Sequence, residues 1–99
     1  MMNEYSNRTT EIIVDGGAVN SRDEFFSTMR SQLGENILIG NNLDALHDAL
    51  TSITCPTDIT VLNRSSLESV LGDYWNRVFS MLMDCLDENC ELSLSFEND

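Results

Sequence analysis

Three short strand-like runs, each separated from the next by helical segments, constrain the fold of this chain more than any other feature. The runs are Glu11–Val14, Ile59–Leu62 and Cys90–Phe96, which are rich in β-branched residues or alternate apolar with polar side chains. Strands joined by helical crossovers pair in parallel, with right-handed connections. The order β-α-α-β-α-α-β therefore predicts an α/β fold, a small two-layer domain whose three-stranded parallel sheet has helices packed on it.

The first two helices are predicted from capping residues and apolar spacing. Ser21–Glu24 matches a capping box, and Gly34 supplies a stop for the helix that follows it. Asn41 and Asn42 are suitable caps for a second helix over Leu43–Ser52. Within the first helix the apolar residues recur at helical spacing, and they are Phe25, Phe26, Met29 and Leu33.

The other two helices follow the middle strand. Ser65–Glu68 matches another capping box and begins a short helix that Gly72 ends. Asp73 is predicted to cap the longest helix, Tyr74–Glu88, and Asn89 is predicted to end it in a left-handed conformation. One face of this long helix is apolar and consists of Trp75, Val78, Phe79, Leu82 and Leu86.

The length of 99 residues allows one domain. We expect it to span residues 11–96, between a flexible N-terminal segment at residues 1–10 and an acidic C-terminal tail at residues 97–99. The first ten residues carry no apolar run, which predicts that there is no signal peptide. No stretch approaches the roughly 18 apolar residues of a membrane span. The expected location is therefore the cytoplasm.

The charge balance narrows the possible partners. The chain carries 17 acidic residues and 5 basic ones, all of them arginines, for a formal net charge of −12 at pH 7. A chain this acidic does not bind nucleic acid by neutralising phosphates, and an anionic membrane would repel it. Two explanations of the charge remain, namely solubility and attraction to a basic partner. Because 41% of the residues are hydrophobic, the chain is able to build a core and is not a disordered acidic tail.

The cysteines and the histidine indicate neither a disulfide framework nor a metal site. Cys55, Cys85 and Cys90 are odd in number and show no CxxC spacing, and His47 is the single histidine. A zinc site with the usual four ligands is therefore not expected, and neither is a cofactor. We interpret the three cysteines as small buried apolar residues in a reducing compartment.

The helix predicted from Leu43 onward has two different faces. Asp44, His47, Asp48 and Thr51 share one arc. Asp44 and Asp48 are like charges at i,i+4 spacing, which costs an isolated helix about 0.2–0.5 kcal/mol. Such an unfavourable pair is consistent with a functional face, although an ordinary solvated face has the same pattern. The opposite arc, which faces the core, consists of Leu43, Leu46, Ala49, Leu50 and Ile53.

Acid–base chemistry is another interpretation of the polar arc. A small hydrolase would use two carboxylates and a histidine, here Asp44, His47 and Asp48. The sequence lacks a glycine-rich phosphate loop, a second histidine and a nucleophile elbow. A chain of this length also encloses a deep cleft only with difficulty. An enzyme is therefore not expected.

The segment Gly40–Thr51 resembles the signature helix of the barstar family, intracellular inhibitors of a secreted bacterial ribonuclease. The family's stretch reads G-E-N-L-D-A-L-W-D-C-L-T, and this chain differs from it only at Asn41, His47 and Ala49. The segment Glu88–Leu92 is similar to the family's last junction between helix and strand. The resemblance extends loosely over residues 11–96 and implies a parallel sheet in the order 1-2-3.

The resemblance also implies a function. In that family the aspartate-bearing helix and the loop before it block the active site of the nuclease. By motif position Asp48 would enter the catalytic phosphate site, where a carboxylate accepts the charge-assisted hydrogen bonds that a phosphate would accept. Asp44 would contact nearby basic groups. An alignment of the chain end on Cys90 puts Asp84 at a further interface acid, although a surface acid paired with Arg77 is an equal interpretation.

The sequence departs from the family at several contact positions. Leu38 stands where the family has a tyrosine, His47 where it has a tryptophan, Asn41 where it has a glutamate and Ser52 where it has a glycine. Aromatic residues often dominate binding energy, so these changes leave open whether the target is the same nuclease. The expected partner-binding residues are Leu38, Gly40, Asn42, Asp44, His47, Asp48, Thr51 and Asp84.

The leading hypothesis from the sequence is an immunity protein that binds a basic ribonuclease toxin and occludes its active site without chemistry. The alternative is an acidic docking module for a basic partner that is not a nuclease. In both cases the partner is a protein, and neither a nucleic acid nor a membrane. We expect the free protein to be a monomer.

Overall fold

The sheet has the predicted strands in the predicted order. The structure is a computed structural model that describes residues 9–33 and 40–98. Its strands are β1 (Thr10–Asp15), β2 (Thr57–Leu62) and β3 (Leu92–Glu97). They form one parallel sheet in the order β1-β2-β3. The α/β class, the parallel pairing and the strand order are therefore confirmed, with β1 and β3 each reaching one residue beyond the expected 11–96 range.

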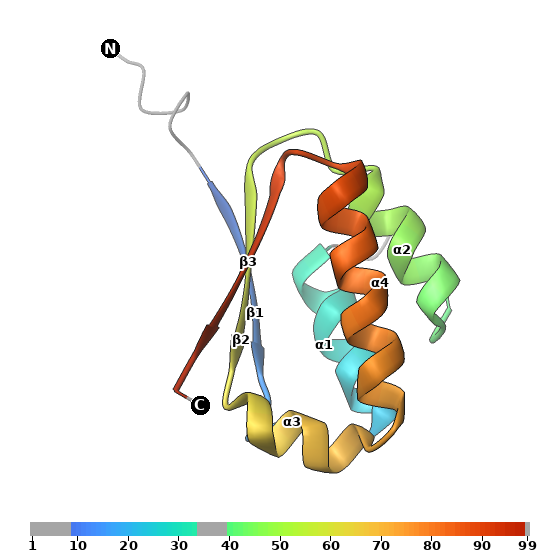
Figure 1. Cartoon of the computed structure of the whole chain (residues 1–99), viewed down its shortest axis with the longest axis vertical. Helices are drawn as coiled ribbons and strands as arrows, with labels where there is room; N and C mark the ends of the chain where they lie inside the picture. Colours follow the sequence, from blue (N-terminus) through green and yellow to red (C-terminus); the bar gives the residue numbers. More distant parts are fainter. Residues whose placement is uncertain (1–8, 34–39, 99) are drawn as a thin grey trace.

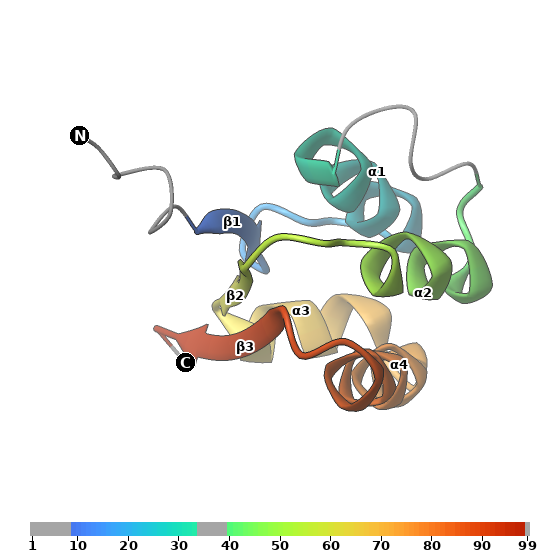
Figure 2. The same ribbon diagram turned by 90° about the horizontal axis from the view of Figure 1, so that it is seen from above.

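The four helices of the described residues all lie on the same side of this sheet (Figure 1). They are α1 (Arg22–Leu33), α2 (Leu43–Thr51), α3 (Arg64–Leu71) and α4 (Tyr74–Glu88). In the view from above, α2 lies on the outer side, farther from the sheet than α1 (Figure 2). It packs against α4, while α1 contacts β1 and α4 contacts β3. Helices α1 and α4 therefore pack directly on the sheet, and α2 packs on α4.

The core lies between the sheet and the helices. Alternating residues of β1 and β2 point into it, because successive strand side chains face opposite sides, and Ile12, Val14, Ile59 and Val61 are almost fully buried. The helices contribute the residues that meet them, among them Phe26, Met29, Leu46, Leu50, Leu67, Val78 and Leu82. This packing fixes which side of α2 faces inward.

On the opposite face of the sheet, no helix of residues 9–33 or 40–98 is packed. Parallel sheets usually have both faces covered, but the outward residues of this sheet are mostly polar, which is compatible with contact with water. Thr60 and Ser95 lie 3.3 Å apart across β2 and β3, and the Ser93 hydroxyl donates to Asp58. The outward apolar residues are Ile13, which is 40% exposed, and Leu62, which is half-buried at the end of β2.

Three of the predicted helix caps differ from the structure. Ser65–Glu68 is not a capping box, because α3 already begins at Arg64, after Asn63 in a left-handed conformation with φ 54°. Asp73 makes no side-chain cap for α4. Asn89 is extended, with φ −135°, and is not the predicted left-handed stop.

At the first helix the predicted capping box is half formed. The Ser21 hydroxyl accepts from the Glu24 amide at 3.1 Å, as predicted. The Glu24 carboxylate, however, accepts from the Asn20 amide at 2.8 Å. The predicted stop, Gly34, lies outside the described residues.

The cysteines are all free thiols, but only one is buried. Cys85 lies in the core, whereas Cys55 and Cys90 are exposed, so the prediction of three buried cysteines is wrong for two of them. Both exposed thiols precede strands, where the chain turns back towards the sheet. Among the described residues, no helix is long and apolar enough to cross a membrane.

Candidate protein-binding site

The start of α2 is fixed by the residues that precede it. Asn42 has extended backbone angles, and its side-chain oxygen accepts a hydrogen bond from the Ala45 amide at 2.8 Å. This is the N-cap that the sequence predicts. Gly40 leaves room for it, because a Cβ at Gly40 would lie 2.9 Å from the Asn42 amide nitrogen. Gly40 and Asn42 therefore set the start of the helix that carries the acidic face.

Side chains from other elements hold both ends of α2. At its start, Arg30 of α1 donates to the Asn41 side chain at 2.7 Å. At its end, the Asn89 amide donates to the carbonyl oxygens of Leu50 and Ile53, at 3.1 and 2.9 Å. Asn89 is buried and also accepts from the Glu91 amide at 3.0 Å. With Leu50 fully buried as well, α2 is held against rotation and displacement.

The two aspartates of α2 point into solvent. Asp44 is exposed, and the Asp48 side chain is 86% exposed. The Thr51 hydroxyl, in contrast, donates to the backbone carbonyl of His47 at 2.8 Å. Thr51 lies on the predicted polar arc, but its hydroxyl hydrogen is already used within the helix.

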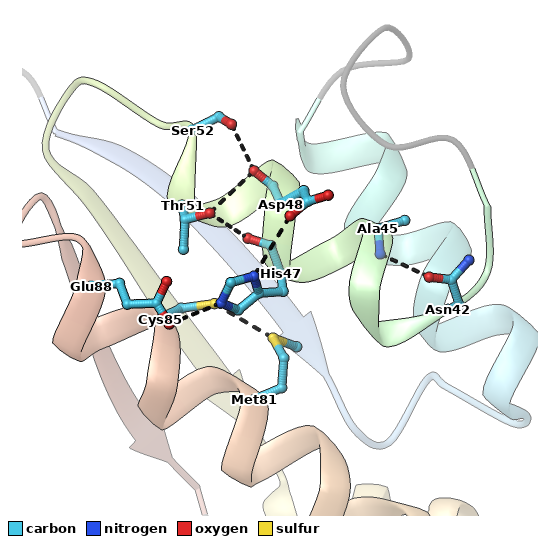
Figure 3. A network of polar contacts seen from close by, with 9 residues as sticks. All are labelled: Asn42, Ala45, His47, Asp48, Thr51, Ser52, Met81, Cys85 and Glu88. Carbon is cyan, nitrogen blue, oxygen red and sulfur yellow. Dashed lines mark hydrogen bonds and ion pairs between the residues drawn. The ribbon is translucent and has the colours of Figure 1, made fainter.

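His47 points from α2 towards α4 (Figure 3). Its Nε2 lies 3.1 Å from a carboxylate oxygen of Glu88, and its Nδ1 lies 3.7 Å from a carboxylate oxygen of Asp48. The hydrogen bond to Glu88, aided by the negative charges of Glu88 and Asp48, raises the pKa of the imidazole, while partial burial acts in the opposite direction. The side chain is 29% exposed, so solvent and a partner both reach it.

A cleft of about 460 Å³ runs between α2 and α4. It brings Asp44 of α2 and Asp84 of α4 to the same hollow, although 40 residues separate them in the sequence. A smaller cleft of about 240 Å³ adjoins it through the shared residues Leu43, Asp44 and Arg77. The larger cleft is lined by Leu43, Asp44, His47, Arg77, Ser80, Met81 and Asp84.

The arginines in the described part of the chain form no ion pair with the acids of α2 or with Asp84. The guanidinium of Arg22 lies 3.8 Å from the centre of the Tyr74 ring, and that of Arg64 lies 4.8 Å from the Phe96 ring and 3.1 Å from Glu68. Arg77 lines the cleft beside Asp84, but within residues 9–33 and 40–98 these two side chains form no ion pair. Asp84 is a surface acid, as one interpretation had it, but the expected pair with Arg77 is not formed.

The acids of α2 also lack an arginine partner in the described part of the chain. Among the described residues, no arginine pairs with Asp44 or Asp48, and the nearest basic group of Asp48 is His47. Coulomb energy between exposed charges is modest, but it adds up when several like charges face one side. The face of α2 and the neighbouring side of α4 therefore form a negative surface that internal cations neutralise only in part.

Comparison with known families decides what kind of domain this is. The family model described as Barstar (barnase inhibitor) matches residues 9–97. The chain belongs to the barstar family. No curated protein matches the sequence significantly.

The barstar family is a family of ribonuclease inhibitors, and the resemblance drawn from Gly40–Thr51 is confirmed. The barstar match spans all three strands and all four helices. In the described residues, no three His, Cys, Asp or Glu side chains gather in a way that would hold a metal ion.

Only some of the expected partner-binding residues lie close together in the structure. Asp44, His47 and Asp84 line one cleft, while Asp48 is adjacent and Gly40 and Asn42 shape the start of the helix. Leu38 lies outside the described residues. Whether these residues contact a partner remains a prediction.

Sequence reasoning did not assign Glu88 to the site. Glu88 binds His47 across 41 positions of sequence, which no local pattern specifies. A signal was present, because Glu88 follows Asp84 at i,i+4 spacing and Asp84 follows Arg77 two turns along the same helix face. That spacing places the three charged groups on the side of α4 that meets α2.

Proposed function

We propose that this barstar-family domain binds a basic ribonuclease and blocks its active site with the exposed face of α2. The observation that carries the proposal is a set of exposed carboxylates, on α2 and in the neighbouring cleft, that form no ion pair with an arginine of the described residues. They are Asp44, Asp48 and Asp84. Unpaired charges on a rigidly held helix are costly for the free protein but available to a partner.

The proposed mechanism is occupation of a phosphate site by a carboxylate. A ribonuclease needs cationic groups to hold the phosphates of its substrate, and a carboxylate accepts the same charge-assisted hydrogen bonds. Asp48 is suited to this role because its side chain is 86% exposed and its backbone lies within a helix fixed at both ends. Little conformational entropy is lost on binding when the group is already held in place.

Asp44 and Asp84 have a different role in this proposal. They line the cleft between α2 and α4, where a basic side chain of the nuclease would enter with two carboxylates near it. The remaining acids contribute through the net charge of −12, which accelerates encounter with a basic enzyme. The protein would act inside the producing cell, as an immunity protein against its own nuclease.

The proposal is tested by an inhibition assay with barnase and a panel of other small basic bacterial ribonucleases. We expect stoichiometric inhibition of at least one enzyme, and Asp48→Ala to weaken it by about two orders of magnitude, because the substitution leaves cationic groups unpaired in the interface. Glu11→Ala, on the uncovered face of the sheet, is the matched control and should leave inhibition intact.

Two results would contradict the proposed function. The first is that no ribonuclease of the panel is bound or inhibited. The second is that Asp48→Ala inhibits as well as the unchanged protein. Capture of a basic protein without nuclease activity would instead support the acidic docking module that the sequence also allows.

A further inference from the structure

His47 lies between α2 and α4 in the proposed binding surface, and it contacts carboxylates on both helices. On its own helix α2 it faces Asp44 and Asp48. The charged and titratable groups that face it from α4 are Arg77, Asp84, Cys85 and Glu88.

The charge of His47 therefore changes the whole surface. When the imidazole is protonated, it pairs with Glu88 at 3.1 Å and lies 3.7 Å from Asp48. The positive charge of the imidazolium then partly neutralises these two carboxylates. When the imidazole is neutral, the same carboxylates face outward with their full charge, and the surface gains one unit of negative charge.

We propose that His47 is a specificity-determining residue whose protonation lowers the affinity of this surface for cationic groups of a partner. The inference rests on the proposed function, because it concerns the face of α2 that is assigned there to the nuclease. His47 competes with the partner's cations for Glu88 and Asp48, and it repels those cations directly. A partner rich in arginine or lysine binds best when the imidazole is neutral.

Binding and folding then depend on pH in opposite directions. Glu88 raises the folded-state pKa of His47 above its ordinary value of 6.5. The contact therefore stabilises the fold fully below about pH 6.5, and this contribution is lost as the pH rises through the raised pKa. A cationic partner favours the neutral imidazole, so its affinity increases over the same pH interval and its binding releases a proton.

The intramolecular contact is tested first, without any partner. His47 is the only histidine of the sequence, so its ring protons give one unambiguous NMR titration in the full-length protein. Glu88→Gln removes the main cause of the raised pKa, and we expect the midpoint to move to lower pH. Glu11→Gln removes the same charge on the uncovered face of the sheet and should leave the midpoint in place. Equal midpoints for Glu88→Gln and the unchanged protein would overturn the inference.

The effect on binding is tested with a deca-arginine peptide, whose side chains do not titrate in the range used. Between about pH 6 and about pH 8.5 we expect its affinity to rise by about three- to tenfold, as one charge at close range would produce. His47→Asn should abolish this pH dependence, and His47→Arg should hold the weak affinity at every pH. Glu11→Gln should keep the pH dependence of the unchanged protein.

The outcomes separate this inference from the proposed function. If the peptide does not bind, or if His47→Asn keeps the pH dependence, the role of His47 is wrong. If the peptide shows the expected behaviour but no ribonuclease is inhibited, the proposed nuclease target is wrong and the role of His47 stands. If a ribonuclease is inhibited while peptide affinity is independent of pH, the role of His47 is wrong and the proposed nuclease target stands.

Discussion

At the scale of single residues, the environment of each side chain decides its chemistry more than its type does. The three cysteines illustrate this. Burial, with the nearby charges of Glu88 and Asp84, raises the pKa of the Cys85 thiol to about 11, whereas Cys55 and Cys90 are exposed. The thiolate is the reactive form, so Cys85 is protected both by its low ionisation and by the core around it.

Thiol labelling of the native protein follows from this difference. With iodoacetamide at about pH 8, Cys55 and Cys90 should react first, and Cys85 about a hundredfold more slowly or not until the protein unfolds. Mass spectrometry of the labelled peptides distinguishes the three sites. Reaction of all three cysteines at one rate would show that Cys85 is not held in the core.

At the scale of elements, one asparagine joins the end of α2 to the segment between α4 and β3. The Asn89 side chain binds the carbonyl oxygens of Leu50 and Ile53 and the amide of Glu91. The last carbonyls of a helix lack partners within the helix; the Asn89 side chain supplies a donor to Ile53 and adds one to Leu50, whose oxygen also accepts from the Ile53 backbone amide at 3.3 Å. Asn89 thereby fixes the helix on which Asp44 and Asp48 are carried.

Removal of this side chain should therefore destabilise the whole domain. We expect Asn89→Ala to lower the free energy of unfolding by about 2–4 kcal/mol, because it leaves buried polar groups unsatisfied. Asn76→Ala, at an exposed position of α4, is the control and should change stability by less than about 0.5 kcal/mol. Urea denaturation measures both, and equal unfolding midpoints for the two variants would refute the structural role of Asn89.

The element order was predictable from local signals, and the long-range contacts were not. The apolar stripe predicted the long helix α4, whose observed bounds agree with the expected ones although Asp73 and Asn89 do not cap it as predicted, and Asn42 caps α2 as expected. The start of α3 was missed because it depends on Asn63, whose side chain donates to Asp15 of β1 at 2.8 Å across the fold. Local sequence patterns contain no information about such a contact.

The candidate site shows the same division. Residues of α2 were predictable because one helix face carries them, and Asp84 was found only through the family resemblance. The contact of His47 with Glu88 and the shared cleft of Asp44 and Asp84 arise from the packing of α2 on α4. That packing is set by core residues such as Leu46 and Val78. These apolar positions do not predict which charged side chains will meet at the surface above them.

At the scale of the whole molecule, the net charge of −12 is distributed over more than one surface. The face of α2 and the adjoining cleft carry Asp44, Asp48 and Asp84, while the uncovered face of the sheet carries further acids, including Glu11 and Glu97. Both surfaces attract a basic protein at long range. Among the described residues, the first combines carboxylates without an arginine partner, a cleft and a helix held at both ends.

We propose that binding to the nuclease depends on where the acidic residues lie on α2, and not on the net charge of the protein as a whole. The most direct test compares two charge-matched double variants by their dissociation constants for an inhibited ribonuclease at one fixed ionic strength. Asp44→Asn with Asp48→Asn removes two charges from α2, and Glu11→Gln with Glu97→Gln removes two from the uncovered sheet face. We predict that the first pair weakens binding by about a thousandfold or more and the second by less than about threefold. Equal losses from the two pairs would contradict the claim.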